Sequence, residues 1–120
     1  MRALGLERNV TFDGRLSRER VFELMARSRV LLHTSRFESF GLVFAEALAC
    51  GARIVSRAVG IAEPSAHWAL GSEAGEMAAA VEKFLALPDR TPQLAYPLER
   101  TVGAYRDLYA GLTVAARAGA

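Results

Sequence analysis

The first half of the chain alternates short apolar runs with a polar turn and a glycine, and this alternation restricts the possible folds more than any other feature. Val30 to Leu32 is an apolar run long enough for a strand buried on both faces, and the charged turn 36–39 follows it. Residues 42–50 are all good or tolerable helix formers, and Gly51 stands where a left-handed C-terminal cap is expected. Residues 52–56 then return to a strand pattern. Strand, helix and strand joined by short links predict right-handed crossovers and a parallel α/β sheet flanked by helices.

The helix predicted over 42–50 has one charged side chain, Glu46, on an otherwise apolar surface. Because desolvating an ionised carboxylate costs several kcal/mol, Glu46 is expected to have a partner. The start of this helix presents the free backbone N–H groups of 41–43 and a partial positive charge, which together favour phosphate binding. Gly41 lacks a side chain, so an oxyanion can approach its backbone closely. Glu46 can accept hydrogen bonds from hydroxyl groups beside that phosphate, such as those of a ribose, and Glu38 can do so on the other side of Gly41.

The segment SRFESFGLVFAEALACG, residues 35–51, resembles the retaining GT-B glycosyltransferases, and Glu38 and Glu46 match the Glu-x7-Glu motif of the "group 1" transferases, family 4. The resemblance implies that Glu38 is the catalytic residue, which orients the donor sugar, and that Glu46 holds the ribose. It assigns the diphosphate to the substrate-binding residues around the Phe-Gly pair, namely Ser39, Phe40, Gly41, Leu42 and Val43. The alternatives are that Glu38 is a solvated loop charge and that Glu46 pairs with an arginine. On this assignment Gly41→Val is expected to harm phosphate binding more than folding.

Two further loops carry weaker parts of the resemblance. The apolar triplet 10–12 predicts a short strand before Gly14, and in the family the loop at this glycine lies near the nucleotide, so the resemblance adds Gly14 to the binding residues. The segment Val59 to Glu63 resembles the Gly-Gly-x-x-Glu loop of the family but has only one of the two glycines, Gly60. Its role near the donor is therefore less secure than that of residues 35–51.

The remaining elements follow from caps and periodicity. Ser17 is a good N-cap for an amphipathic helix that ends near 26–28, and His33 closes the strand that follows, where a hydrogen-bonded structural role is favoured over a catalytic one. A short strand is expected near 67–70. Further predictions are a helix capped by Ser72 that runs to about Leu85, a last helix from about Leu98 to Leu112 with Tyr105 and Tyr109 packed inward, and a frayed tail over 113–120. For the two tyrosines the alternative is a sugar platform.

Composition excludes several functional classes. The formal net charge of +2 and the pI near 9.1 are mild, and the arginines are scattered, which favours local anion binding over a nucleic-acid surface. The single cysteine, Cys50, cannot form an internal disulfide. No apolar run approaches the roughly 20 residues of a membrane span, and no signal-peptide core is visible at the N-terminus, so a cytoplasmic chain is expected. The resemblance implies neither a metal nor a cofactor, because helix dipoles and cationic side chains neutralise the leaving diphosphate in this fold.

The resemblance covers roughly residues 9–112, the later part of a Rossmann-like donor-binding domain. The opening strand and helix of that domain, which carry an Arg and a Lys for the diphosphate, have no match in this sequence, and neither does the N-terminal acceptor domain. Residues 1–120 are therefore expected to be one partial nucleotide-sugar-binding domain, a fragment of a transferase that moves a hexose from a nucleotide-diphosphate sugar with retention.

The partners expected are this donor, the missing acceptor domain or a partner subunit, and an acceptor at a membrane surface. The alternative is a non-catalytic nucleotide-sugar-binding module that needs a partner half. A generic flavodoxin-like phosphate binder does not explain both glutamates.

Overall fold

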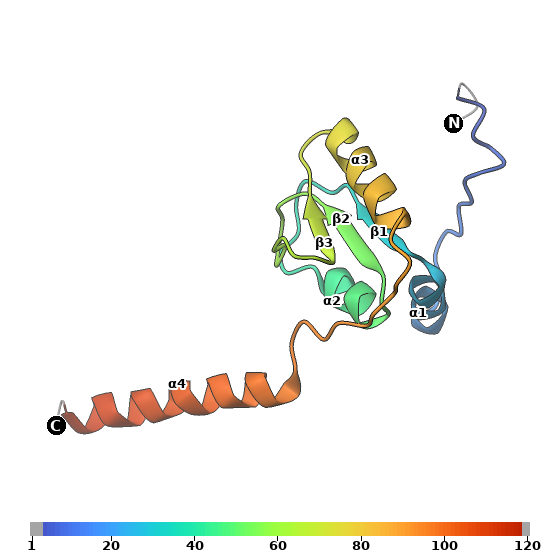
Figure 1. Cartoon of the computed structure of the whole chain (residues 1–120). Helices are drawn as coiled ribbons and strands as arrows, with labels where there is room; N and C mark the ends of the chain where they lie inside the picture. The colour runs from blue at the N-terminus through green and yellow to red at the C-terminus, as the bar shows by residue number, and fades with distance from the viewer. Residues whose placement is uncertain (1–3, 119–120) are drawn as a thin grey trace.

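The computed structural model describes the backbone of residues 4–118 and the side chains as far as residue 112. Helices and strands alternate from α1 to β2, after which come a third strand and two helices (Figure 1). In chain order they are α1 (Arg18–Arg27), β1 (Val30–His33), α2 (Leu42–Ala49), β2 (Arg53–Ser56), β3 (Trp68–Leu70), α3 (Ala74–Leu85) and α4 (Leu98–Ala118).

The three strands form one parallel sheet in the order β1-β2-β3. Neighbouring residues of the central strand β2 point to opposite faces of the sheet. Ile54 packs in a cluster with α2, whereas Val55 packs in a cluster with α3. Helix α1 packs against α2 on the first of these faces. The sheet is therefore covered on both sides, which confirms the Rossmann-like α/β class predicted from the sequence.

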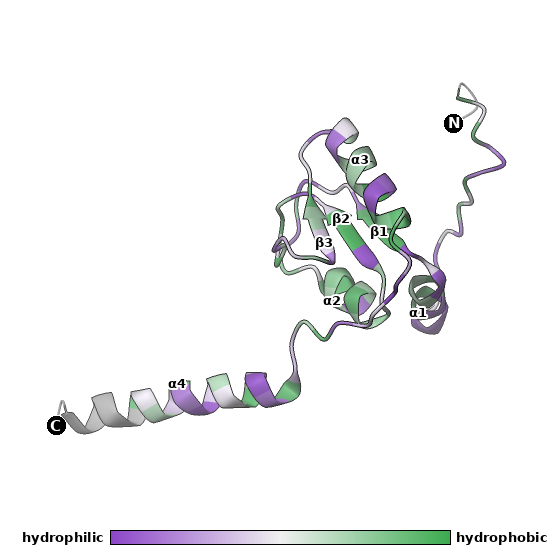
Figure 2. Ribbon diagram, viewed as in Figure 1, coloured by the Kyte–Doolittle hydropathy of each residue, from purple (hydrophilic) through white to green (hydrophobic). Residues whose placement is uncertain are grey.

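The core lies between α2 and the sheet. Phe44 of α2 and Ile54 of β2 are fully buried, and Trp68 of β3 is 4% exposed. The rings of Phe44 and Trp68 are 4.7 Å apart, and the indole N–H of Trp68 donates a hydrogen bond of 2.8 Å to the hydroxyl of Ser56, which is itself fully buried. Apolar residues dominate α2 and the strands (Figure 2). The small core thus fixes the position of α2 relative to the ends of β2 and β3.

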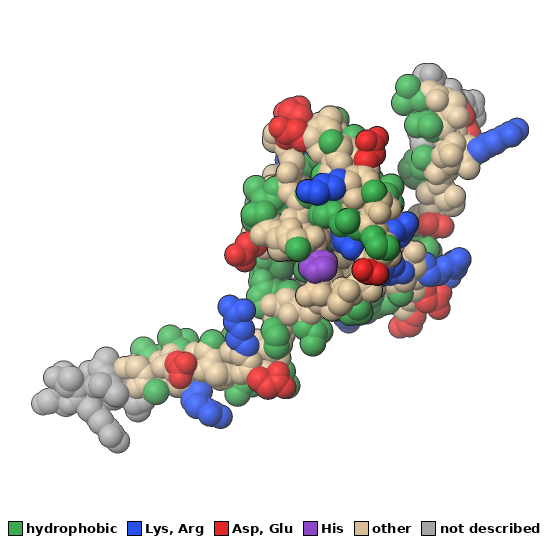
Figure 3. All heavy atoms as spheres, in the orientation of Figure 1, with side chains coloured by type: hydrophobic (Ala, Val, Ile, Leu, Met, Phe, Trp, Pro, Cys, Tyr) green, Lys and Arg blue, Asp and Glu red, His purple; other side chains and the backbone are tan. Residues whose placement is uncertain are grey.

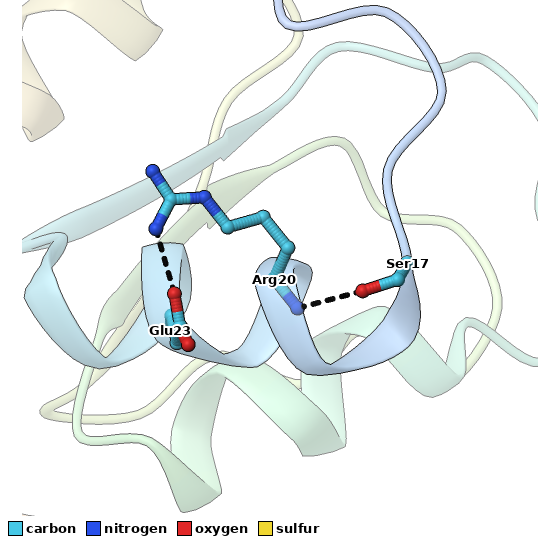
Figure 4. Close-up of polar contacts among 3 residues, drawn as sticks. All are labelled: Ser17, Arg20 and Glu23. Atoms are coloured by element: carbon cyan, nitrogen blue, oxygen red, sulfur yellow. Dashed lines mark hydrogen bonds and ion pairs between the residues drawn. The ribbon is translucent and has the colours of Figure 1, made fainter.

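Helix α1 begins as the sequence predicts. The hydroxyl of Ser17 accepts a hydrogen bond of 3.3 Å from the backbone N–H of Arg20, and the guanidinium of Arg20 pairs with Glu23 one turn further on, at 2.6 Å (Figure 4). Glu19 lies in the first turn, where the helix dipole favours a negative charge. The cap sets the start of α1, and its turn at residue 18 contacts the candidate site described below.

The predicted strand over 10–12 is absent. Phe12 is 80% exposed, Val10 is 40% exposed, and the segment from residue 4 to α1 runs away from the sheet as an irregular chain (Figure 1). A strand is stabilised by the hydrogen bonds of its neighbour, and within the described residues no neighbouring strand pairs with these residues. An apolar triplet alone was therefore insufficient evidence for a strand.

Two helix boundaries also differ from the predictions. The N-cap of α3 is Glu73 rather than Ser72, because the carboxylate of Glu76 accepts hydrogen bonds from the backbone N–H groups of both Ser72 and Glu73, at 2.8 and 3.3 Å. Helix α4 continues past residue 112 to Ala118, whereas fraying of the tail remains a prediction. The inward packing expected for Tyr105 and Tyr109 is not found, since their side chains are 59% and 65% exposed.

Candidate functional site

The loop 34–41 connects β1 to α2 at the carboxyl ends of the strands, which is where parallel sheets bind their ligands. The loop after β2 holds it in place, because the backbone N–H of Ile61 donates a hydrogen bond of 2.8 Å to the carbonyl of Phe40. Gly60 adopts a left-handed backbone with φ +58°, and a Cβ at this position would collide with the same carbonyl oxygen. The glycine that the Val59–Glu63 segment retains therefore permits the close approach of the two loops.

Gly41 caps the N-terminus of α2 in the left-handed conformation, with φ +89°. A Cβ here would lie 2.6 Å from two ring carbons of Phe44, so the core lies directly beneath this residue. Among the described residues, no oxygen accepts a hydrogen bond from the N–H groups of 41–43. The start of α2 thus presents the unpaired donors that the sequence predicts for an anion.

Glu46 lies one turn into α2, and its side chain is 29% exposed. Its Oε1 pairs at 3.4 Å with the guanidinium of Arg18, at the start of α1. The arginine pairing considered as an alternative is therefore present. Because Arg18 is 77% exposed and the distance is long, this pair contributes little to stability, about 0–1 kcal/mol. The geometry leaves Glu46 available to other donors.

Glu38 is held by His33, at the end of β1. The imidazole Nε2 and the carboxylate Oε1 are 3.1 Å apart, and the side chains are 15% and 29% exposed respectively. His33 also packs edge-on against Phe44, at 4.8 Å between ring centroids. Glu38 is therefore not a freely solvated loop charge. His33 is hydrogen-bonded, as the sequence predicts, and the structure identifies its partner as this carboxylate.

The remaining predicted residues lie in the turn between β1 and α2 or at the start of α2, except Gly14, which lies before α1. Ser39 and Leu42 are exposed, Val43 packs against the core cluster, and Phe40 contacts Tyr96 at 5.8 Å between centroids. Gly14 precedes α1 and has open space around it, with no atom within 4 Å of a Cβ placed there. The structure thus brings residues 38–46 together around the start of α2, and the binding roles of all eight predicted residues stay predictions.

Comparison with known families identifies the chain. A family model described as "Glycosyl transferases group 1" matches residues 1–95. The chain belongs to this family. No curated protein matches the sequence. Membership supports glycosyl transfer as the general activity, and the matched residues include the whole site and every element except α4.

The part of this group 1 glycosyltransferase chain that the structure describes lacks two kinds of feature. No group of three or more His, Cys, Asp or Glu side chains lies close enough to hold a metal ion within that part of the chain. None of the helices there has the length and apolar character needed to cross a membrane.

The sequence analysis missed two polar side chains at this edge of the sheet. It did not connect His33 with Glu38, although five residues across a tight turn at a strand end would have permitted the contact. It also overlooked Arg57, which directly follows β2 and therefore lies at the same edge of the sheet as the site. In both cases the signal was a polar residue at the carboxyl end of a predicted strand, since His33 ends β1 and Arg57 follows β2.

Proposed function

We propose that this chain binds a nucleotide-diphosphate sugar at the start of α2 and supplies the donor half of a retaining hexosyltransferase of family 4, with the GT-B architecture. The observation that carries the proposal is the arrangement of two carboxylates on either side of an unpaired helix N-terminus. Glu38 and Glu46 flank the free N–H groups of 41–43, at the carboxyl end of a parallel sheet.

Each group has a distinct role in this proposal. The N–H groups of 41–43 stabilise the negative charge that develops on the departing diphosphate, and the dipole of α2 adds to their effect. Glu46 accepts hydrogen bonds from the ribose hydroxyls. Glu38, which His33 holds in one orientation, accepts hydrogen bonds from the hydroxyls of the sugar and positions its anomeric carbon.

The acceptor belongs to another part of the transferase. Transfer needs a second wall that orients the acceptor, and we propose that an N-terminal domain or a partner subunit supplies it. We place the enzyme in the cytoplasm, with an acceptor at a membrane surface. Without that wall the chain is expected to bind donor but not to turn it over.

A second candidate function is a non-catalytic module that binds nucleotide sugars and pairs with a separate subunit. The observation that favours it is the open edge of β1, where Leu32 is 50% exposed and no strand pairs on the outer side in the described part of the chain. Donor hydrolysis distinguishes the two functions. If the chain reconstituted with an acceptor domain binds donor but never cleaves the sugar–phosphate bond, the binding module is the better description.

Calorimetric titration with UDP-, GDP- and ADP-sugars and the bare nucleotides tests the donor site. Glu46→Ala is expected to weaken binding of the preferred nucleotide sugar by about 1–3 kcal/mol, because it removes charge-assisted hydrogen bonds to the ribose. Glu82→Ala is the matched control. It removes the same charge from an exposed position of α3, on the other face of the sheet.

Arg18→Gln completes the design, because it separates the ligand role of Glu46 from its ion pair. This variant breaks the contact between Arg18 and Glu46 but leaves the carboxylate in place. If only the ion pair matters, Arg18→Gln and Glu46→Ala weaken binding equally. If Glu46 holds the ribose, only Glu46→Ala does. Absence of binding to every nucleotide sugar tested contradicts the proposed donor site.

A further inference from the structure

A hollow separate from the candidate donor site lies at the carboxyl ends of β2 and β3, beside the loop that carries Glu38. It is an open cavity of about 420 Å³. Its lining includes Arg36 from the loop after β1, Arg57 and Val59 from the loop after β2, and Gly71 from the end of β3. Three loops that are separate in sequence thus bring two guanidinium groups to one place.

Neither guanidinium has a partner in the described part of the chain. No hydrogen bond or ion pair joins the guanidinium of Arg36 or of Arg57 to another side chain or to a carbonyl group there, and the contacts that Arg57 makes with Ser56 and Val59 involve its backbone carbonyl. The Nε of Arg57 is buried from solvent and has no acceptor. A buried N–H without an acceptor destabilises the protein, so a ligand that provides an oxygen at this point removes that penalty.

Glu76 supplies the one carboxylate in the lining of the cavity, and this carboxylate already accepts hydrogen bonds from neighbouring residues. Glu76 accepts hydrogen bonds from the backbone N–H of Ser72 at 2.8 Å, from the hydroxyl of Ser72 at 3.0 Å and from the backbone N–H of Glu73 at 3.3 Å. These bonds lower the pKa of Glu76, with the backbone N–H of Ser72 as the largest cause. The carboxylate therefore serves the N-terminus of α3 and pairs with neither arginine. The cavity keeps two unneutralised positive charges against one internally compensated negative charge.

We propose that this cavity is a phosphate-binding site in which Arg36 and Arg57 hold a phosphate or diphosphate group. Guanidinium groups present paired N–H donors that match phosphate oxygens, and two of them on different loops can clamp one group from two sides. The position fits this use, because the hydrogen bond from Ile61 to Phe40 joins the Arg57 loop to the loop of Glu38. The site itself does not depend on the proposed function, which bears only on the molecule that carries the phosphate.

Titration of the full chain with inorganic pyrophosphate tests the proposal. We expect the wild type to bind pyrophosphate, with an affinity that falls as the salt concentration rises, and Arg57→Gln and Arg36→Gln to weaken binding tenfold or more. Arg106→Gln is the matched control, because it removes the same charge from an exposed position of α4 and should leave the affinity unchanged. Absence of binding to the wild type, or an equal affinity in all three variants, overturns the proposal.

The Nε–H resonance of Arg57 provides a second readout that does not depend on a variant folding correctly. In ¹⁵N-labelled wild-type protein this resonance is expected to shift during the pyrophosphate titration, since its buried nitrogen gains an acceptor. Arg36 is exposed, so Arg36→Gln keeps the test valid if Arg57→Gln fails to fold. An unmoved Nε–H resonance at saturating pyrophosphate contradicts the assigned site.

Two arms identify the source of the phosphate. If it is the donor diphosphate, a saturating nucleoside diphosphate displaces pyrophosphate, and the two arginine variants bind the nucleoside diphosphate more weakly. If it is an acceptor phosphate, glycerol phosphate binds in the presence of the nucleoside diphosphate and depends on the same arginines. Both results support the site. Glu46→Ala separates this site from the proposed donor site, because it should abolish only the ribose-dependent part of nucleotide binding.

Discussion

Gly41 combines two requirements at one residue. Its left-handed backbone starts α2 with free N–H groups, and its missing side chain leaves room for the ring of Phe44 directly below. The sequence analysis assigned the glycine to phosphate binding, and the structure adds a packing reason of comparable weight. A larger residue at this position is therefore expected to harm folding and binding together rather than binding alone.

Gly41→Ala is expected to lower the free energy of unfolding by about 1–3 kcal/mol. The reasons are the unfavourable backbone conformation for alanine and the overlap of its Cβ with Phe44, which is fully buried and has little freedom to move. Urea denaturation of both proteins measures the difference. Gly75→Ala is the control, since Gly75 lies in α3 with nothing within 4 Å of its Cβ position, and this change should be neutral or slightly stabilising. Equal stability of Gly41→Ala and the wild type would contradict the packing role.

For single residues, the sequence predicted where the two glutamates lie better than it predicted which side chains they contact. The placement of Glu38 and Glu46 around a helix start follows from the pattern of strand, turn and helix, and the structure has them there. Their contacts with His33 and Arg18 depend on the directions of side chains across a turn and between two helices. Those directions are set by tertiary packing and therefore cannot be predicted from spacing alone.

Among the elements, α3 shows how one carboxylate can determine where a helix begins. The carboxylate of Glu76 accepts hydrogen bonds from the backbone N–H groups of Ser72 and Glu73, which precede its own helix. The bond from Ser72 is the main cause of its lowered pKa. A carboxyl group whose pKa is lower in the folded than in the unfolded protein stabilises the fold above its unfolded pKa. That stabilisation is lost as the pH falls through the lowered pKa.

Glu76→Gln is therefore expected to destabilise the chain at neutral pH, and the difference from the wild type should shrink in acid. Thermal unfolding from pH 7 down to pH 3 measures this difference. Glu82→Gln, on the same helix and exposed, should show a small difference that does not depend on pH in this way. A Glu76→Gln effect that stays constant across the range would mean that charge is not the reason for the cap.

The sequence predicted helices and strands well where the residues of the element itself indicate its type. The 3.6-residue periodicity and the caps identified α1 and α3, the run of helix formers before Gly51 identified α2, and the apolar runs identified β1 and β2. The triplet 10–12 shows the limit, because a strand also needs a neighbour, and within the described residues none pairs with this segment. The shift of the α3 cap from Ser72 to Glu73 has another cause, since Glu73 and Glu76 form a capping box in which each side chain accepts a hydrogen bond from the backbone of the other residue.

The whole molecule combines a small packed domain with a long helix that leaves it. The chain measures 71 × 30 × 30 Å, and α4 accounts for about 31 Å of that length at 1.5 Å per residue (Figure 1). Apolar and charged side chains lie together on the visible face of α4 (Figure 3). Leu98, Leu108 and Leu112 are each more than half exposed, so α4 gains little stability from burial.

The backbone amides of α4 are expected to exchange with solvent far faster than those of β2, which is buried along its whole length. Helices in proteins gain most of their stability from tertiary packing, which the exposed side chains of α4 largely lack, whereas opening of β2 requires disruption of the core. Hydrogen–deuterium exchange followed by mass spectrometry measures both segments in one experiment. Slow exchange in α4 that persists on dilution would show that the helix packs within its own chain, and slow exchange only at high concentration would show association between chains.

The packing of Trp68 gives this chain a built-in optical probe. It is the sole tryptophan in the sequence, its ring contacts Phe44, and Phe44 in turn lies under Gly41 at the start of α2. Its indole N–H also bonds the hydroxyl of Ser56, one residue before Arg57. The indole therefore contacts Phe44 beneath the candidate donor site and Ser56 beside the arginine cavity. Its fluorescence can follow ligand titrations and unfolding of the unlabelled protein in one experiment.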